Sequence, residues 1–368
     1  LKPAIRSLRN NDAANPGDCD KIIVDGTSAS GAMGAILGTS GDSAAYEPYL
    51  EEIGAADTSD AVFAVMNFCP IIDLDNVEIA YEWMFGPYYD LEFYQDPACE
   101  ADIVLSDIMA SYYPAYLNSL GLKDPETGKA LTLDEKDIYS GSYMDYLLGY
   151  INDAATEYLS DMTADEIAAY LDSEDAQGRK ISTWLSYDAK TKEATVTDFA
   201  GYVTGWYKSA LKMKTVPSFN DIPGRHAGEP FYESVYSENS VFGTYEVQNR
   251  NFSNYLSQAL TDAQAKGYWK DLDPKDYVVS DEVKALANMY NPMYWIANED
   301  EDISTFAEHF YVRVGNKDHD TSQTIATNYA TALMNNGHDV DFKMQWEQPH
   351  AGDYEMDEMF AWLESVCK

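Results

Sequence analysis

Short, nearly continuous apolar runs lie near both ends of this chain. The first run, KIIVDG at 21–26, is rich in β-branched residues, as expected of a buried strand. Small apolar residues follow at 29–38 and are typical of a helix that packs closely on a sheet. The next run, AVFAVMNFCPIID at 61–73, is apolar almost throughout, as parallel strands covered on both faces are. Strand, helix and strand in this order predict a βαβ unit.

The same alternation returns in the last part of the chain. FYVRVG at 310–315 predicts a strand, and VDFKMQW at 340–346 predicts another after the turn NNGHD. Helices are predicted between these strands, at 322–334, and after them, at 357–366, where DEMFAWLESV is amphipathic. Residues 3–10 are expected to form the end of a helix. Both ends of the chain therefore contribute strands and helices of an α/β fold.

The middle of the chain differs from both ends in composition and in its pattern of apolar residues. Tyrosines are frequent there, charged helical patterns such as TADEIAAYLDSED alternate with loops, and apolar strand runs are missing from the sequence. LSYDAKTKEATVTDF at 185–199 predicts one small hairpin. The middle of the chain is thus predicted to be mostly helical.

Composition and charge narrow the choice of partners. Of the 368 residues, 45% are hydrophobic and 13% are aromatic, which fits a packed globular protein. Acidic residues outnumber basic residues by 63 to 24, and the formal net charge is -39 at pH 7. Such a field repels nucleic acids and anionic membrane surfaces, so neither is expected as a partner. No apolar stretch reaches the roughly 18 residues of a membrane span, and no span is expected.

No pattern in the sequence predicts a cofactor. The cysteines are scattered along the chain, at Cys19, Cys69, Cys99 and Cys367. No C-x-x-C pair occurs, which argues against a zinc site and leaves disulfide pairing open. IDLDN at 72–76 and NEDEDIS at 298–304 cluster the oxygen ligands that Ca²⁺ takes, but the EF-hand pattern is absent. We therefore expect no cofactor, with Ca²⁺ at one of these acidic stretches as the alternative.

A candidate nucleophile follows the first predicted strand. In GTSAS at 26–30, Ser28 lies between a strand and a helix, as in the G-x-S-x-G turn of serine hydrolases. Ser30 occupies the place of the second glycine and adds only a hydroxymethyl group. Two alternatives stay open: Ser28 is an ordinary helix N-cap, or Ser30 is the nucleophile.

Two residues far along the chain supply the partners that such a serine needs. Asp318 and His350 each come just after one of the predicted strands near the C-terminus. Functional groups of open α/β sheets gather beyond the carboxyl ends of the strands, where Ser28 also lies. An imidazole takes the serine proton, and a carboxylate orients the imidazole. The backbone N–H of Ala29 is the expected oxyanion donor.

The order serine, aspartate, histidine along the chain is that of the α/β-hydrolase triad. We therefore predict an α/β-hydrolase core formed by residues 1–81 and 285–368. Residues 82–284 are predicted to form a large, mostly helical lid or substrate domain inserted into this core.

The segments that carry these residues resemble the bacterial tannase family, α/β-hydrolases that cleave galloyl esters and have feruloyl-esterase relatives. They are VDGTSASGAMGAILGTSGDS at 24–43, AVMNFCPIIDLDN at 64–76, VGNKDHDTS at 314–322 and QPHAGDYE at 348–355. The family typically has G-T-S-A-G-G at the serine, K-D-x-D-T-S at the acid and H-x-G-D-Y at the histidine, so only Ser30 departs. In the middle of the chain the resemblance is weaker and is limited to 213–221 and 236–243.

The resemblance implies roles for particular residues. The serine, aspartate and histidine named above would form the catalytic triad, and Asp320 would bind galloyl hydroxyls. Lys214 and Glu238, from the inserted segment, would lie near the same hydroxyls, with an ordinary lid surface as the alternative. Carboxylates accept hydrogen bonds from phenols, and a cation favours a partly ionised phenol.

Members of this family have several strands upstream of the serine, including a loop that supplies a second oxyanion donor. Here the serine comes near the start of the chain. We expect an N-terminal fragment of the same gene product to complete the sheet, with a truncated chain as the alternative. The localisation stays open, with a secreted or cell-envelope bacterial protein expected rather than a cytoplasmic one.

The sequence as a whole predicts a serine esterase that hydrolyses galloyl- or feruloyl-type esters of phenolic acids through an acyl-enzyme. Its partner would be a small aryl ester. The alternatives are a serine hydrolase of the same fold with another acyl substrate, such as a carbohydrate esterase or peptidase, and a non-catalytic binding protein on a hydrolase scaffold.

Overall fold

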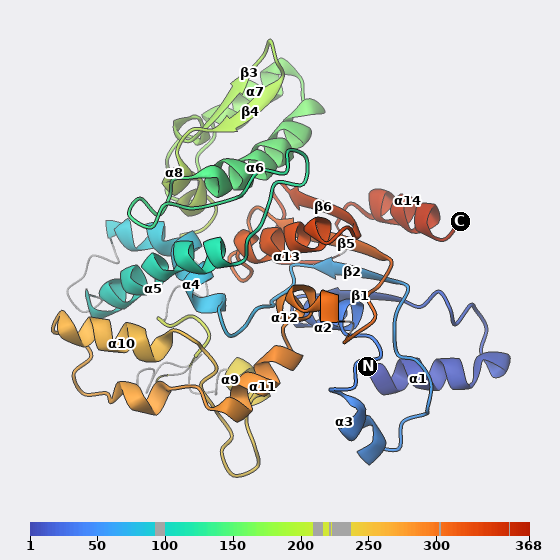
Figure 1. Ribbon diagram of the computed structural model, residues 1–368. Helices are drawn as coiled ribbons and strands as arrows, with labels where there is room; N and C mark the ends of the chain where they lie inside the picture. The colour runs from blue at the N-terminus through green and yellow to red at the C-terminus, as the bar shows by residue number, and fades with distance from the viewer. Residues whose placement is uncertain (93–99, 209–215, 221, 223–236, 302, 353) are drawn as a thin grey trace. The chain divides into compact units, whose positions relative to one another are not determined.

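The computed structural model describes residues 1–92, 100–208, 216–220, 222, 237–301, 303–352 and 354–368 (Figure 1). These residues form two compact units. Unit 1 comprises Leu1–Asp73, Asn288–Thr321 and Ile325–Lys368, and unit 2 comprises Leu74–Ala287 with Ser322–Thr324.

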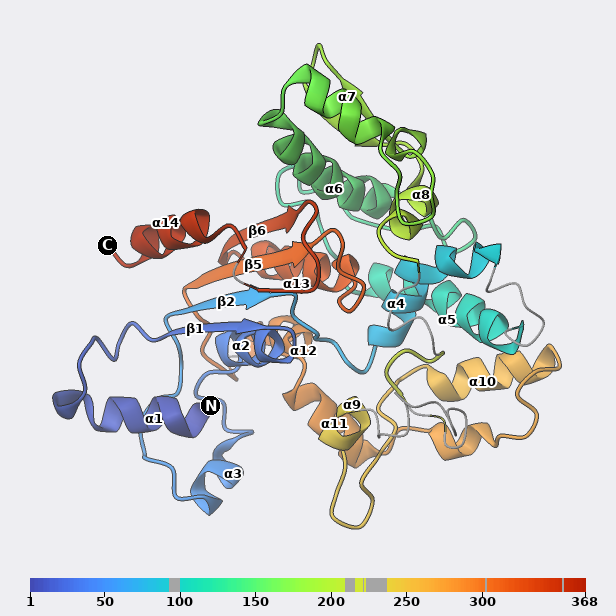
Figure 2. The ribbon, with the colours of Figure 1, turned by 180° about the vertical axis from the view of Figure 1, so that it is seen from behind.

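Unit 1 contains a four-stranded sheet in the order β1-β2-β5-β6. The strands are β1 (Ile23–Thr27), β2 (Ala64–Phe68), β5 (His309–Gly315) and β6 (Asp339–Gln345). Every neighbouring pair is parallel (Figure 2), and the last residues of β1 and β2, Thr27 and Phe68, lie opposite each other and in register with Arg313 of β5. The predicted parallel α/β arrangement is thereby confirmed.

The strand predicted over 61–73 is too long. The structure has only five residues of this run in β2, because Cys69 takes a positive φ of 45° and Pro70 has no N–H to extend the ladder. The chain leaves the sheet at this point.

Helices cover both faces of the sheet. The helices of unit 1 are α1 (Lys2–Asn10), α2 (Ala29–Thr39), α3 (Glu47–Glu52), α12 (Pro292–Ala297), α13 (Gln323–Asn335), whose first two residues belong to unit 2, and α14 (Met356–Val366), with short 3₁₀ turns at Asp12–Ala14 and Glu299–Glu301. Consecutive residues of β5 point to opposite faces: Phe310 meets Tyr329 of α13 at 6.4 Å between ring centroids, whereas Tyr311 meets Trp362 of α14 at 5.1 Å. A sheet covered in this way explains why β2 and β5 are apolar almost throughout.

Small residues bring α2 close to the sheet, as its composition predicts. A Cβ on Gly34 would lie 2.7 Å from Asn67 Nδ2, and a Cβ on Gly38 would lie 3.0 Å from Val65 Cγ1. Larger residues at these positions would push the helix away from β2.

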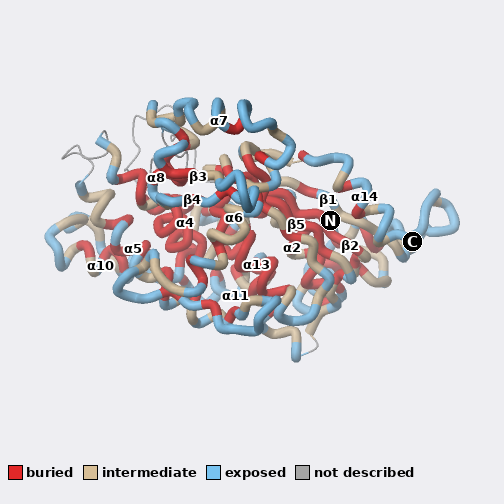
Figure 3. Tube along the Cα trace, turned by 90° about the horizontal axis from the view of Figure 1, so that it is seen from above, coloured by how far each residue is buried: buried red, intermediate tan, exposed pale blue. Residues whose placement is uncertain are grey.

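Unit 2 is mainly helical. Its elements are α4 (Val77–Phe85), η2 (Gly86–Asp90), α5 (Glu100–Ser119), α6 (Ser142–Ser160), α7 (Ala164–Asp172), η5 (Ile181–Thr183), β3 (Leu185–Asp188), β4 (Glu193–Val196), α8 (Phe199–Gly205), α9 (Ser237–Val241), α10 (Leu256–Ala265), η7 (Pro274–Tyr277) and α11 (Asp281–Met289), whose last residues belong to unit 1. β3 and β4 pair antiparallel, which confirms the hairpin predicted over 185–199. Every residue of α4 is buried (Figure 3).

In the part of the chain that the structure describes, no helix is long and apolar enough to cross a membrane. Cys19, Cys69 and Cys367 are free thiols, and Cys99 lies outside the described residues.

Helix α4 carries a carboxyl group in the interior of unit 2. Burial raises the pKa of Glu82 to about 7, although hydrogen bonds from Ser106 and Ser218 act in the opposite direction. Because this pKa lies above the ordinary value of 4.5, the folded protein holds the proton more tightly than the unfolded chain does. The resulting stability is complete below about pH 4.5 and is lost as the pH rises to about 7.

Replacing this carboxyl should flatten the pH dependence of unfolding. In Glu82→Gln a neutral amide of the same shape replaces the acid, so a stability difference on the order of 3 kcal/mol between low and neutral pH disappears. Thermal unfolding, monitored by circular dichroism from about pH 4.5 to 7.5, measures this pH-dependent difference in stability. Glu135→Gln removes an equal charge at an exposed position and serves as the control. Parallel curves for wild type and Glu82→Gln would contradict the expectation.

Candidate active site

Ser28 lies on a sharp turn between β1 and α2. Its backbone has φ 61° and ψ -122°, a region that costs a non-glycine residue roughly 1–3 kcal/mol. An N-cap residue usually has extended backbone geometry, and its side chain accepts from the first turn of the helix. Among the residues that the structure describes, the Ser28 side chain makes no such capping bond. The turn has the strained geometry of a strand–nucleophile–helix elbow.

Close backbone contacts hold this turn. The Ser28 N–H donates to Phe68 O of β2 at 2.9 Å. A Cβ on Gly26 would lie 2.4 Å from Ser30 O, and a Cβ on Gly31 would lie 2.7 Å from Phe68 O. Ser30 itself is exposed, so its hydroxymethyl group does not obstruct the turn. The glycines that this elbow requires are those at positions 26 and 31.

Asp318 follows β5 and is held by the loop that it begins. Its Oδ1 accepts from the N–H of Asp320 at 2.8 Å and from the N–H of Thr321 at 2.7 Å. The side chain is fully buried, and its Oδ2 lies 2.9 Å from His350 Nδ1. Two backbone donors therefore fix the carboxylate in the position from which it meets the histidine.

His350 lies in the loop after β6, and this loop runs beside the loop after β5. Lys317 N donates to Gln348 O at 2.9 Å, and a Cβ on Gly315 would lie 2.2 Å from the same carbonyl oxygen. The imidazole is largely buried, with 19% of the side chain exposed. Because a carboxylate only accepts, the neutral ring carries its proton on Nδ1 and has its lone pair on Nε2.

The histidine loop also reaches the elbow. A Cβ on Gly352 would lie 1.9 Å from Thr27 Oγ1, so this loop passes directly against the residue before Ser28. The structure thus gathers Ser28, Asp318 and His350 at the carboxyl edge of one sheet, within unit 1. The serine, acid and base of a hydrolase occupy such positions.

Cys69 belongs to the same cluster, although no sequence motif predicts a role for it there. It follows β2 directly, and its Sγ lies 3.3 Å from Ala351 O and 3.5 Å from the Tyr354 hydroxyl. Burial, and next the nearby Asp318 charge, raise the pKa of the Cys69 thiol far above its usual range. The thiol is therefore neutral at physiological pH and unsuited to act as a nucleophile. Its place after a buried strand was the available signal in the sequence.

Among the described residues, one group could offer ligand atoms to a metal ion, and it consists of Cys69, Asp318 and His350. One ligand atom from each lies within 4.8 Å of the others. Asp318 and His350 are already hydrogen-bonded to each other, and the thiol is protonated, so the donors are engaged without an ion. The acidic stretches at 72–76 and 298–304 form no comparable group among the described residues.

The remaining predicted site residues are placed as follows. Ala29 is the first residue of α2, where helical N–H groups have no intrahelical partner. Asp320 is half-buried in the acid loop of unit 1. Glu238 is half-buried in α9 of unit 2. Lys214 lies outside the described residues.

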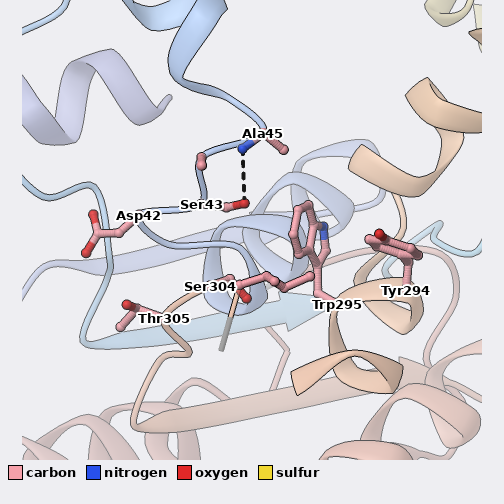
Figure 4. A pocket seen from close by; sticks show the side chains of 9 residues that line it. Asp42, Ser43, Ala45, Tyr294, Trp295, Ser304 and Thr305 are labelled. Carbon is pink, nitrogen blue, oxygen red and sulfur yellow. Dashed lines mark hydrogen bonds between the residues drawn. The ribbon is translucent and has the colours of Figure 1, made fainter. Parts of the chain in front are cut away.

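Unit 1 also contains a pocket of about 500 Å³ away from these residues. Figure 4 shows its lining, which includes Asp42, Ser43, Tyr294, Trp295, Ser304 and Thr305. The Ser43 hydroxyl accepts from Ala45 N at 3.4 Å within its own loop. None of the predicted site residues lines this pocket.

Adding a methyl group at the elbow should destabilise the protein. In Gly31→Ala the new Cβ meets backbone oxygens that cannot rotate away, so a loss of about 1–3 kcal/mol in unfolding free energy is expected. Gly149→Ala, in α6 where the Cβ meets open space, should stabilise by up to about 1 kcal/mol. Urea denaturation of both variants measures the difference. Equal effects of the two substitutions would contradict the tight elbow.

No protein-family model matches the sequence, and no curated protein matches it. Solved structures match over the whole chain. Fusobacterium nucleatum tannase is 30% identical with a TM-score of 0.75, and the chain covers 72% of it. Tannin acyl hydrolase from Lactobacillus plantarum is 28% identical with a TM-score of 0.75 and 70% coverage.

A third match is tannin acyl hydrolase in complex with 3,4-dihydroxybenzoate, at 29% identity, a TM-score of 0.76 and 70% coverage. These matches confirm the family resemblance that the sequence motifs predict. The chain belongs to the tannase family and is a carboxylic ester hydrolase.

Proposed function

We propose that this chain hydrolyses galloyl- or feruloyl-type esters of phenolic acids through an acyl-enzyme on Ser28. The observation that carries the proposal is the 2.9 Å hydrogen bond between His350 Nδ1 and Asp318 Oδ2, in a loop that touches the strained serine elbow. Membership of the tannase family supports the ester class.

In the proposed reaction Ser28 Oγ attacks the ester carbonyl carbon, and its proton passes to His350 Nε2. Asp318 accepts a hydrogen bond from the Nδ1–H group of His350 and stabilises the imidazolium that forms. The carbonyl oxygen becomes an oxyanion that accepts a hydrogen bond from the Ala29 N–H. Imidazolium then gives its proton to the departing alcohol, and water, activated by the same histidine, releases the acid from the acyl-enzyme.

The acyl group is proposed to be a phenolic ring that Asp320 recognises. Asp320 lies two residues after Asp318, and a carboxylate accepts hydrogen bonds from ring hydroxyls. Solved structures of tannin acyl hydrolase are complexes with ethyl gallate and with 3,4-dihydroxybenzoate, both of which carry ring hydroxyls. Lys214 and Glu238, from the proposed substrate domain at 82–284, are proposed to complete this recognition.

The net charge of the chain suits this substrate. An ester of a phenolic acid is neutral, whereas the released acid is an anion at neutral pH. A formal charge of -39 leaves the neutral ester unaffected and disfavours the anionic product. The long-range field of the chain therefore supports product release.

Serine and histidine variants should abolish hydrolysis of methyl gallate. Ser28→Ala removes the nucleophile and His350→Ala removes the base, so kcat should fall by at least about 10³-fold in each. Ser30→Ala is the matched control, because this exposed neighbour is proposed to have no role, and it should keep wild-type activity. Release of gallic acid, followed by chromatography, measures all three. Retained activity in Ser28→Ala, or its loss in Ser30→Ala, would refute the assignment.

A panel of esters tests the acyl class. Methyl gallate and methyl ferulate should be hydrolysed with kcat/KM at least about tenfold above methyl acetate, because only phenolic acids supply ring hydroxyls to Asp320. Peptide esters should be poor substrates for the same reason. Equal rates on gallate and acetate would favour a general carbohydrate esterase or another acyl hydrolase.

A chelator should leave the activity unchanged, because no step of the proposed mechanism requires a metal. Asp318 and His350 are engaged with each other, and the acyl transfer needs only their hydrogen bond. Methyl gallate hydrolysis after dialysis against EDTA measures this. Loss of activity that Zn²⁺ or Ca²⁺ restores would contradict the mechanism.

A further inference from the structure

Helix α4 carries two carboxylates in the interior of unit 2, one helical turn apart. Glu78 is 1% exposed and Glu82 is 0% exposed. Burial raises the pKa of both groups. Buried carboxylates stabilise a fold less well than apolar residues of similar size, so their hydrogen-bond partners are informative about their role.

Glu82 connects α4 to two other segments. Its carboxylate accepts from Ser106 of α5 at 2.6 Å and from Ser218 at 2.7 Å. Ser218 belongs to the segment 216–220, which comes directly after the stretch that contains Lys214. One carboxylate therefore fixes this segment to a buried helix.

Glu78 begins a longer chain of hydrogen bonds. Its Oε1 accepts from both the backbone N–H and the side-chain amide of Asn220, each at 2.9 Å. Asn220 Oδ1 accepts in turn from Asn239 Nδ2 at 3.0 Å. Asn239 Nδ2 also donates to Arg250 O at 2.9 Å, and Phe252 N donates to Asn220 Oδ1 at 3.2 Å. The side chains of Glu78, Asn220 and Asn239 are all buried. Arg250 and Phe252 take part only through backbone atoms.

The chain of bonds ends on α9, a helix of five residues. A helix this short has little stability of its own, so its position depends on tertiary contacts. Asn239 is 2% exposed and points into the network, whereas its neighbour Glu238 is half-buried. The orientation of Glu238 is therefore set through Asn239.

We infer that the series Glu78–Asn220–Asn239 is a positioning device for Glu238, and that it determines the preference for acyl rings that carry hydroxyl groups. The inference rests on the proposed function, in which Glu238 binds ring hydroxyls. Asn239 and Asn220 act through Glu238 and do not themselves touch the substrate. The directional amide–carboxylate bonds specify one orientation, which apolar packing alone would leave less defined.

The test compares two substrates that differ only in ring hydroxyls, methyl gallate and methyl benzoate. Asn239→Ala should lower the ratio of their kcat/KM values about tenfold, mainly through a higher KM for the gallate. Hydrolysis of methyl benzoate should change by less than about threefold, since that ester makes no hydroxyl contact. A general structural defect would lower both rates together and leave the ratio unchanged, which would overturn the inference.

Asn118→Ala is the matched control for lost hydrogen bonds. Asn118 exchanges two bonds with the Leu133 backbone in unit 2 and lies outside the network. Its replacement should leave the substrate ratio at the wild-type value. If thermal unfolding shows that Asn239→Ala does not fold, Asn239→Asp takes its place. This variant keeps the side-chain volume but turns a carboxylate toward the Asn220 and Arg250 oxygens. The substrate ratio should therefore fall in the same way.

A double variant separates this inference from the proposed function. Glu238→Gln should itself lower the ratio, and adding Asn239→Ala should lower it no further, because the asparagine acts through the glutamate. An unchanged ratio in Glu238→Gln would overturn the proposed substrate contact, and this inference with it. If Glu238→Gln lowers the ratio but Asn239→Ala leaves it unchanged, only the positioning role is overturned. The same holds if the double variant lowers the ratio further than Glu238→Gln does.

Discussion

The register of three parallel strands is the constraint on which the candidate site depends. Thr27, Phe68 and Arg313 lie opposite one another on β1, β2 and β5. The loops that follow these strands therefore all begin at the carboxyl edge of the sheet. The ladder continues into the loops, where Ser28 N donates to Phe68 O and Cys69 N donates to Arg313 O. A slip of one residue would turn every side chain of a strand to the opposite face and separate the serine from its partners.

Different kinds of hydrogen bond fix the loops within each of the two units, and each kind suits the function proposed for that unit. In unit 1 the elbow and the acid loop are fixed by backbone groups, which neither titrate nor change rotamer, and this suits a reaction that needs a constant geometry. In unit 2 the buried carboxylates of α4 hold irregular segments by side-chain hydrogen bonds. Such bonds specify orientation, which suits the discrimination of similar substrates.

The sequence predicts the sheet well because its strands depend on local signals, and the positions of the proposed triad residues are inferred from the same signals. Apolar runs mark the strands, and Ser28, Asp318 and His350 each follow one. The early end of β2 at Cys69 could not be predicted, because a positive φ at a cysteine arises from tertiary contacts. The requirement for glycine at position 31 rather than 30 depends on which residue faces Phe68, which the motif alone does not reveal. The Glu78–Asn220–Asn239 series joins residues up to 142 positions apart and has no local signature.

The central claim is that Ser28 is the activated nucleophile, and labelling with a fluorophosphonate followed by peptide mapping tests it most directly. Only a serine activated by a neighbouring base reacts with this probe. The account predicts one adduct per chain, located on Ser28, and none in His350→Ala. An adduct on Ser30 or on any other residue, or an unmodified wild-type chain, would contradict it.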